Sequence, residues 1–144
     1  MERVVLDTNV YVSHLLAPVG LPARIFSHWR ALAFQLIVSP AILAEVRHTL
    51  GYARIRRKYA ITDAMVERLI DLLEHDAILV SGSADVAGAI PDDPDDEEIL
   101  ACAVDGRADL SVSGDRHLLA LGAFRGIPIL SPRDFLARFP ERPL

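Results

Sequence analysis

Four acidic residues stand where carboxylates from separate segments can act together. Asp7 directly follows the apolar run VVL, Glu45 lies in AILAEV, Asp96 lies in DDPDDEE, and Asp115 follows the run DLSVS after one glycine. Carboxylates that lie close together repel one another unless a cation binds between them, and Mg²⁺ and Mn²⁺ prefer such oxygen ligands. A bound ion of this kind activates water and stabilises the charge that grows as a phosphodiester bond breaks. The four acids therefore predict a metal-dependent site for phosphodiester cleavage.

Alternating strands and helices are expected to position these acids. Short apolar runs predict buried strands at residues 3–7, 34–39, 77–81, 109–113 and 128–130. Helices are predicted between them, at residues 10–16, 23–32, 41–50, 52–60, 63–76, 95–106, 114–122 and from 132 onward. Thr8 or Asn9 is expected to cap the first helix, Ser39 the third and Thr62 the fifth. The alternation indicates one α/β domain over residues 1–144, with about five strands in a mostly parallel sheet. Ligands bind beyond the carboxyl ends of such strands, where the acids are expected to meet.

The charges of the chain are unevenly distributed. The net charge is −5, but residues 92–98 hold six acids, and outside this run 14 acids stand against 15 lysines and arginines. Residues 46–62 contain no acid and carry a cluster of basic side chains. A concentrated acidic site and a separate basic segment are therefore predicted, and the acidic net charge does not exclude a nucleic-acid partner.

Cysteine content and hydropathy indicate the cellular compartment in which the protein is expected. Cys102 is the only cysteine, which excludes an internal disulfide and is typical of a reducing cytoplasm. Its neighbours in ILACAV are apolar, so we expect its side chain in the core. No run approaches the about 18 apolar residues that a membrane span needs. A cytoplasmic protein without a membrane segment is expected.

Four segments, VVLDTNV, SPAILAEV, DPDDEEILACAV and ADLSVSGDRHLLAL, occur in this order along the chain. Together they resemble the PIN-domain family, and most closely the PIN (VapC-like) toxins of bacterial and archaeal toxin–antitoxin pairs. The resemblance extends from Arg3 to about Leu136, and IPILSPRDFLARF resembles the last strand and helix of that family. It implies a three-layer α/β/α sandwich with a central, mostly parallel sheet, and a metal-dependent ribonuclease activity.

The resemblance also implies roles for the four acids, which match the four acids of the family in order. Asp7, Asp96 and Asp115 would bind the metal, either one ion or two. Glu45 would hold the attacking water or act as its base. Asp95 is the alternative to Asp96 as the third acid, because several acids in this run lie close enough to contribute.

Further residues match the surroundings of these acids in the family. Asn9 matches the polar residue beside the first acid, and Ser113 stands where the family usually has threonine. A serine keeps the hydroxyl, which would orient a carboxylate or a water. Asp92, Asp93 and Glu98 also lie near the third acid in the sequence.

The basic segment is the candidate RNA-contact surface if the resemblance holds. Its arginines and lysine would neutralise phosphates without reading bases, and Tyr52 and Tyr59 would stack on unpaired bases. The alternative is a solvated helix face whose tyrosines pack inward. The four basic residues are Arg54, Arg56, Arg57 and Lys58.

The resemblance extends to binding partners. A small antitoxin is expected to cover the acidic site, with an arginine or lysine inserted among the carboxylates. A homodimer is also expected, because dimers are common in the families that this chain resembles.

Other classes of protein fit the residues less well or remain alternatives. A haloacid-dehalogenase-like phosphatase needs a second aspartate two residues after its nucleophile, where this chain has Asn9. A phospho-receiver domain needs an acidic pair before its phosphorylated aspartate and a late lysine, but Lys58 is the only lysine. A non-catalytic PIN-like module that binds RNA or protein, and a housekeeping RNA-processing nuclease without an antitoxin, remain alternatives.

Overall fold

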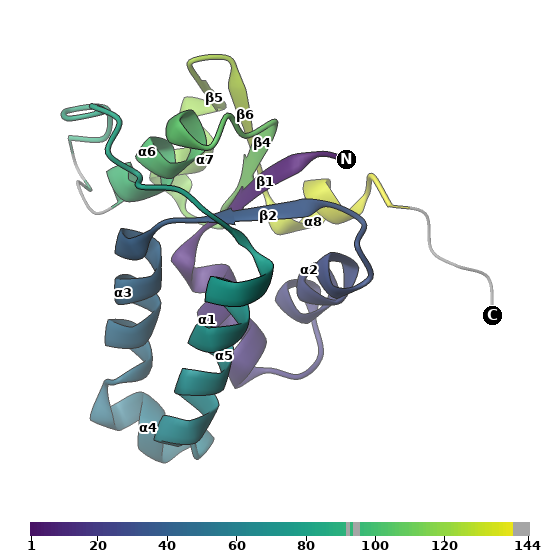
Figure 1. The fold of residues 1–144 in the computed structure, drawn as a ribbon, viewed down its shortest axis with the longest axis vertical. Helices are drawn as coiled ribbons and strands as arrows, with labels where there is room; N and C mark the ends of the chain where they lie inside the picture. The colour runs from purple at the N-terminus through teal and green to yellow at the C-terminus, as the bar shows by residue number, and fades with distance from the viewer. Residues whose placement is uncertain (92, 94–95, 140–144) are drawn as a thin grey trace.

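The computed structural model describes residues 1–91, 93 and 96–139 of the 144-residue chain. Within these residues the chain forms six strands and eight helices (Figure 1). In chain order they are β1 (Arg3–Leu6), α1 (Thr8–Leu16), α2 (Leu21–Arg30), β2 (Gln35–Val38), α3 (Pro40–Leu50), α4 (Ala53–Tyr59), α5 (Asp63–Asp76), β3 (Ile78–Leu79), α6 (Glu97–Asp105), β4 (Leu110–Val112), α7 (Arg116–Leu121), β5 (Ala123–Phe124), β6 (Ile127–Leu130) and α8 (Pro132–Leu136).

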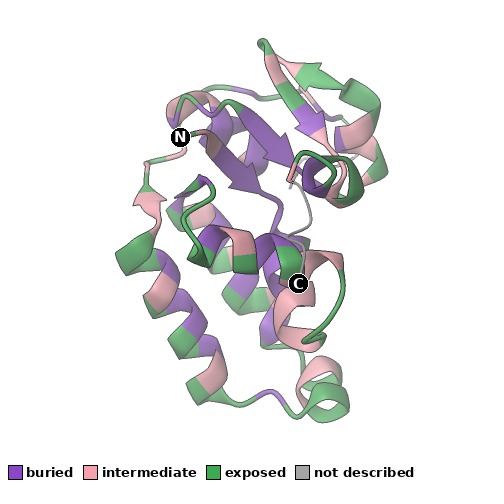
Figure 2. Ribbon diagram, turned by 90° about the vertical axis from the view of Figure 1, so that its right-hand side faces the viewer, coloured by how far each residue is buried: buried purple, intermediate pink, exposed green. Residues whose placement is uncertain are grey.

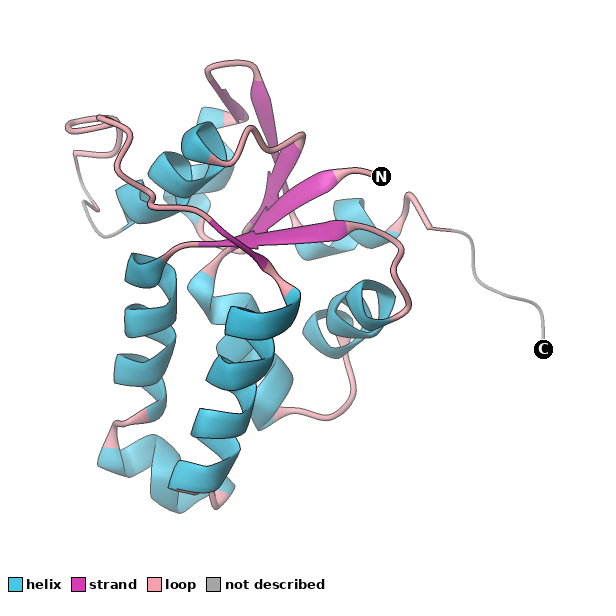
Figure 3. Cartoon of the chain, viewed as in Figure 1, coloured by secondary structure: helices cyan, strands magenta, loops and turns pink. Residues whose placement is uncertain are grey.

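The strands form one sheet in the order β3-β2-β1-β4-β6-β5, in which every neighbouring pair is parallel except β5 and β6. Helices α1, α2, α3 and α5 gather on one side of the sheet, and α6 and α7 lie on the other (Figures 1 and 3). This arrangement follows from right-handed crossovers, because the chain moves first toward one edge of the sheet and then toward the other. The three-layer α/β/α architecture with a mostly parallel sheet is confirmed.

Strand β1 lies inside the sheet and is deeply buried. Val4, Val5 and Leu6 have no exposed surface, as a strand covered by helices on both faces requires (Figure 2). The chain leaves β1 toward β2 on one side and returns to pair β4 on the other. In an open α/β sheet the strand order reverses at such a point, and a crevice forms beyond the carboxyl ends of the two strands. The residues that follow β1 and β4 therefore meet in that crevice.

The sixth strand differs from the expected sheet of about five strands. Residues of β5 pair antiparallel with the start of β6, through a two-residue turn formed by Arg125 and Gly126. Both turn residues have positive φ, 49° and 81°, which is the requirement of a type I′ hairpin turn. The sequence did not predict β5 for two reasons. Arginine rarely adopts a positive φ, so Arg125-Gly126 is a weak turn signal. A strand of two residues is also too short to show hydrophobic alternation.

Two of the predicted helix caps are confirmed and one is wrong. Ser39 accepts a hydrogen bond from the Ile42 N–H, and Thr62 caps α5 in the same way. Helix α1, however, begins at Thr8, and its N-cap is Asp7 rather than Thr8 or Asn9. The acid at the end of β1 therefore also starts the helix that follows.

The position of Cys102 agrees with the sequence expectation. Cys102 lies in the core with no exposed surface, and burial raises the pKa of its thiol to about 12. Within the part of the chain that the structure describes, no helix is both long and apolar enough to span a membrane.

Candidate metal centre

Asp7 is buried at the carboxyl end of β1, with 3% of its surface exposed. Its backbone N–H donates to the Val112 carbonyl at 2.9 Å, which continues the pairing of β1 with β4. Its Oδ2 accepts a 2.6 Å hydrogen bond from the Ser113 hydroxyl, and its Oδ1 accepts a longer one, 3.4 Å, from the Asn9 N–H. The two neighbouring strands thus fix both the backbone and the carboxylate of Asp7.

Ser113 joins Asp7 to the next acid along the sheet. Its hydroxyl donates to Asp7 and accepts a 2.9 Å hydrogen bond from the Asp115 N–H. Asp115 is the N-cap of α7, and its Oδ1 accepts from the N–H groups of His117 and Leu118 at 2.7 and 3.3 Å. These bonds satisfy the free N–H groups at the start of the helix and fix the carboxylate of Asp115.

Asp96 approaches the same crevice from the other direction, at the N-cap position of α6. It makes no capping bond through its side chain and instead shares a hydrogen bond with Asp115. Its Oδ2 atom is buried, and no group among the described residues hydrogen-bonds to it. A buried carboxylate oxygen without a hydrogen-bond partner is costly, so this atom is suited to bind a cation.

The three carboxyls influence one another strongly. Burial, the shared hydrogen bond with Asp115 and the charges of Asp115 and Asp7 raise the pKa of Asp96 to about 8. Burial acts to raise the pKa of Asp115, but the hydrogen bonds from Asp96 and from backbone N–H groups outweigh it and lower that pKa. Burial also raises the pKa of Asp7 against the opposing effect of Ser113. Without a cation, Asp96 is therefore the member of the cluster that holds a proton.

Two further side chains join Asp96 and Asp115. The ligand atoms of Asp93, Asp96, Asp115 and His117 all lie within 4.8 Å of one another. The Nδ1 atom of His117 lies 3.8 Å from Asp93 Oδ2 and from Asp115 Oδ1. The acidic run had made Asp93 a possible contributor, but the sequence had given no reason to include His117. The one available signal was its position two residues after Asp115, in the first turn of the same helix.

The cluster fits a divalent cation. Two ligand atoms about 2.1 Å from one ion lie about 3.0 Å apart at right angles and about 4.2 Å apart when opposite. The separations of up to 4.8 Å exceed the distance between opposite ligands by at most about 0.6 Å, so side-chain adjustment can bring the four atoms around one ion. The unpartnered oxygen of Asp96 and the excess of negative charge both favour a bound cation. Asp93, Asp96 and Asp115 would hold it, with Asp7 contributing its charge from the end of β1.

Two other residues of the predicted site that the structure describes, Glu45 and Asn9, lie outside this cluster. Glu45 is half-buried in the second turn of α3, where its Oε1 accepts a weak 3.5 Å hydrogen bond from the Thr49 hydroxyl. Asn9 contributes its backbone N–H to Asp7 rather than its side chain. Asp92, and Asp95 as the alternative third acid, lie outside the described residues.

The basic segment forms α4, at the end of the α3 and α5 pair that points away from the sheet (Figure 1). The guanidinium of Arg56 is committed to the fold, since it donates to the Leu50 carbonyl at 2.7 Å and forms an ion pair with Asp63. Tyr52 and Tyr59 are 52% and 40% exposed, so they do not pack inward as the alternative interpretation required. The other three basic residues, Arg54, Arg57 and Lys58, have exposed side chains.

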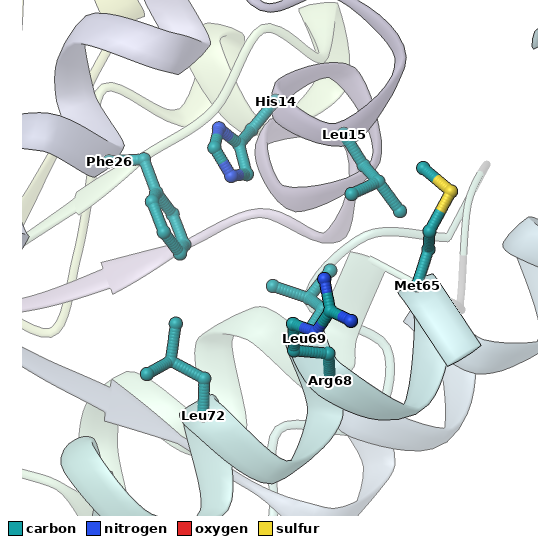
Figure 4. A pocket seen from close by; sticks show the side chains of 7 residues that line it. All are labelled: His14, Leu15, Phe26, Met65, Arg68, Leu69 and Leu72. Carbon is teal, nitrogen blue, oxygen red and sulfur yellow. The ribbon is translucent and has the colours of Figure 1, made fainter.

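A separate apolar groove lies between α1, α2 and α5 (Figure 4). It encloses about 220 Å³, and its floor includes His14 stacked on Phe26 with ring centroids 3.8 Å apart. Met65, Leu69 and Leu72 line the α5 side. Among the described residues, the groove is lined by no carboxylate and shares no residue with the acidic cluster, so it does not match the site of the metal chemistry.

Comparison with known proteins identifies the family of this chain. The family model of the PIN domain matches residues 3–117. The chain belongs to the PIN domain family. The match includes all four predicted acids, and the resemblance inferred from the sequence segments is confirmed at the level of the family.

The chain is similar to one curated protein in sequence and to one solved structure in fold. The uncharacterized protein MJ1680 of Methanocaldococcus jannaschii is 24% identical over 119 residues, which cover 83% of this chain and 74% of the relative. A chain in the crystal structure of VapBC2 from Rickettsia felis, bound to a DNA fragment from their promoter, has a TM-score of 0.59 and 13% identity. The similarity covers 90% of this chain and 98% of that chain. At this identity the likeness shows that the two share a fold.

Removal of the Ser113 hydroxyl is expected to destabilise the PIN domain. Ser113→Ala leaves Asp7 Oδ2 and the Asp115 N–H without their partner, at a cost of about 1 to 3 kcal/mol in the free energy of unfolding. Urea unfolding in EDTA measures this loss. Ser113→Thr keeps the hydroxyl and is the matched control. Equal stability of Ser113→Ala and wild type would contradict the bridging role of this hydroxyl.

The metal-free PIN domain is expected to lose stability as the pH rises through the pKa of Asp96. The folded state keeps a proton on Asp96 up to about pH 8, whereas the unfolded chain releases it near pH 4. Between these values the folded state binds more protons, so raising the pH favours unfolding. Asp96→Asn removes this penalty. In EDTA at pH 8.5 its Tm should exceed that of wild type by at least about 4 °C, which corresponds to about 1 kcal/mol in a domain of this size.

The same comparison at pH 4.5 and with a control variant isolates the effect. At pH 4.5 the carboxyl is protonated in the folded state, and the pH is less than one unit above the pKa of aspartate in the unfolded chain. The advantage of Asp96→Asn should therefore be much smaller than at pH 8.5. Asp71→Asn, which changes an exposed acid of α5, should leave the Tm unchanged at both pH values. An Asp96→Asn protein no more stable than wild type at pH 8.5 would show that the cluster does not strain this carboxylate.

Proposed function

We propose that this PIN domain is a metal-dependent endoribonuclease. The observation that carries the proposal is the buried, unpartnered Oδ2 atom of Asp96 within a cluster of carboxylates. The cluster lies at the point where the strand order reverses, which is the usual ligand site of this type of sheet. Membership in a family of nucleases supports the same reaction class. Mg²⁺ or Mn²⁺ is the proposed cofactor, because oxygen atoms dominate the donor set.

The side chains of the site have complementary roles in the proposed reaction. When bound, a divalent ion lowers the pKa of water and stabilises the charge on the phosphate. Asp96 and Asp115 hold the ion, and Asp7 adds charge from the rigid end of β1. Glu45 accepts the proton of the attacking water, whose oxygen forms a bond to phosphorus as the bond to the leaving oxygen breaks. The leaving oxygen then takes a proton from solvent, so the reaction needs no covalent intermediate.

Three exposed side chains of α4 are proposed to bind the RNA backbone. Arg54, Arg57 and Lys58 point to solvent, whereas Arg56 is held by Leu50 and Asp63. Helix α3, which leads from the sheet to α4, has 11 residues and is therefore roughly 16 Å long. An RNA strand must therefore extend along this helix to reach both the basic residues and the acidic cluster. These contacts increase affinity without reading the sequence of the bases.

A toxin role within a type II toxin–antitoxin pair is proposed for the protein as a whole. The support is the fold that it shares with a chain of the VapBC2 complex, which contains a promoter DNA fragment. A small antitoxin would then neutralise the acidic cluster by inserting an arginine or lysine between Asp96 and Asp115. A positive side chain would relieve the same repulsion as a metal ion and would exclude the ion from the site. A homodimer in the cytoplasm is the proposed state of the active protein.

Metal-dependent cleavage of single-stranded RNA tests the proposed reaction. Wild type with Mg²⁺ or Mn²⁺ should cleave a fluorescent RNA, and EDTA should abolish cleavage. Asp7→Asn and Asp96→Asn should each reduce kcat by at least about 100-fold, a loss of about 2.7 kcal/mol of transition-state stabilisation. The control Asp71→Asn should cleave like wild type. The proposal fails if wild type is inactive with every divalent ion, or if Asp7→Asn and Asp96→Asn remain fully active.

The salt dependence of RNA binding tests the role of α4. In the non-cleaving Asp7→Asn background, Arg54→Ala combined with Arg57→Ala should weaken binding of a single-stranded RNA. The slope of log affinity against log salt should become shallower by about 1.4, because each lost phosphate contact removes about 0.7. Fluorescence anisotropy at several salt concentrations measures this slope.

A matched control separates local contacts from a change in net charge. Arg107→Ala combined with Arg133→Ala also removes two exposed positive charges, but from α8 and from the turn after α6. This pair should leave the slope unchanged. Equal effects of the two double variants would mean that α4 is not the RNA-contact surface.

A further inference from the structure

The Nδ1 atom of His117 lies in the acidic cluster, but no hydrogen bond from a described residue accounts for its burial. His117 lies in the first turn of α7, and its backbone N–H already serves the cap formed by Asp115. Its Nδ1 atom is buried and has no hydrogen-bond partner among the described residues. The two nearest carboxylate oxygens, of Asp93 and Asp115, both lie 3.8 Å away.

These separations are too long for hydrogen bonds, which join a nitrogen and an oxygen at about 2.7 to 3.2 Å. They fall instead between the about 3.0 Å and 4.2 Å that separate pairs of ligands around one small ion. The Nδ1 atom is therefore placed with respect to two carboxylates as a third ligand would be. Asp115 fixes this position, because the carboxylate that caps α7 also determines where the first turn begins.

We propose that His117 binds the metal ion directly through Nδ1, beside the carboxylates of Asp96 and Asp115. The inference rests on the metal site of the proposed function and adds a nitrogen ligand to it. Imidazole in its neutral form offers one ring nitrogen with a free lone pair, and the other nitrogen then carries the proton. The site becomes a mixed oxygen and nitrogen site rather than one made of carboxylates alone.

A nitrogen ligand changes which ion the site prefers. Mg²⁺ retains oxygen ligands and water, whereas Mn²⁺ and the later transition ions accept imidazole more readily. We therefore expect this site to bind Mn²⁺ more tightly than Mg²⁺, and His117 to be the cause of the difference. Substitution by glutamine keeps a polar side chain of similar length but removes the ring nitrogen.

Electron spin-echo spectroscopy of bound Mn²⁺ tests the ligand itself, independently of RNA cleavage. A directly bound imidazole produces a ¹⁴N modulation, which wild type should show. His117→Gln should lose it, whereas His75→Gln, which changes an exposed histidine of α5, should keep it. Competition calorimetry provides the second measurement. His117→Gln should weaken Mn²⁺ binding by about tenfold or more, and Mg²⁺ binding much less.

The outcomes distinguish this inference from the proposed function. If wild type binds Mn²⁺ without ¹⁴N modulation, or if His117→Gln keeps the modulation, His117 is not a ligand, and the metal-dependent nuclease still stands. If wild type binds neither Mn²⁺ nor Mg²⁺, the proposed function and this inference both fail. Absence of the modulation in wild type is enough to exclude His117 as a ligand, so this outcome does not depend on correct folding of the variant.

Discussion

The parallel pairing of β1 with β4 is the constraint on which the rest of the structure depends. It places the end of one strand beside the end of the other, so that Asp7 and Ser113 become neighbours although 106 positions separate them in the chain. The Ser113 hydroxyl then links Asp7 to Asp115 through one donated and one accepted hydrogen bond. Both strands are buried, so neither carboxylate position can shift without disturbing the core. The sheet thereby holds the carboxylates of Asp7 and Asp115 in fixed positions.

The cluster combines two uses of the same carboxylates. Asp7 and Asp115 are helix N-caps, a role that stabilises α1 and α7 by satisfying free N–H groups. Asp96 stands at the corresponding position of α6 but caps nothing, and it receives the unfavourable influence of the other charges. Hydrogen bonds thus oppose the cost of a buried charge at Asp7 and outweigh it at Asp115, whereas burial and the neighbouring charges prevail at Asp96. Asp96 is the position where a cation has most to contribute.

The sequence predicted the layers of the fold and most of the acids that meet, because both depend on local patterns. Apolar runs identify buried strands, and an acid after such a run lies at a strand end. Which other side chains reach these acids was not predictable from local patterns. Whether Glu45 or His117 reaches the carboxylates depends on side-chain direction and on the packing of whole helices, and neither leaves a periodic signal. The cap of α1 was misassigned for a related reason, since Asp7, Thr8 and Asn9 are all good capping residues and only the backbone geometry decides between them.

The two outer strands of the sheet have a consequence for the solution behaviour of the protein. Both β3 and β5 contain only two residues, and β5 runs antiparallel to the strand that it covers. Long, flat outer strands invite pairing with the strands of other molecules and lead to aggregation, whereas such short ones offer few backbone groups for this purpose. The hairpin at Arg125 and Gly126 thus leaves only a short edge strand on this side of the sheet, which hinders pairing with the sheets of other molecules. Association between copies of the chain by extension of the sheet is therefore disfavoured.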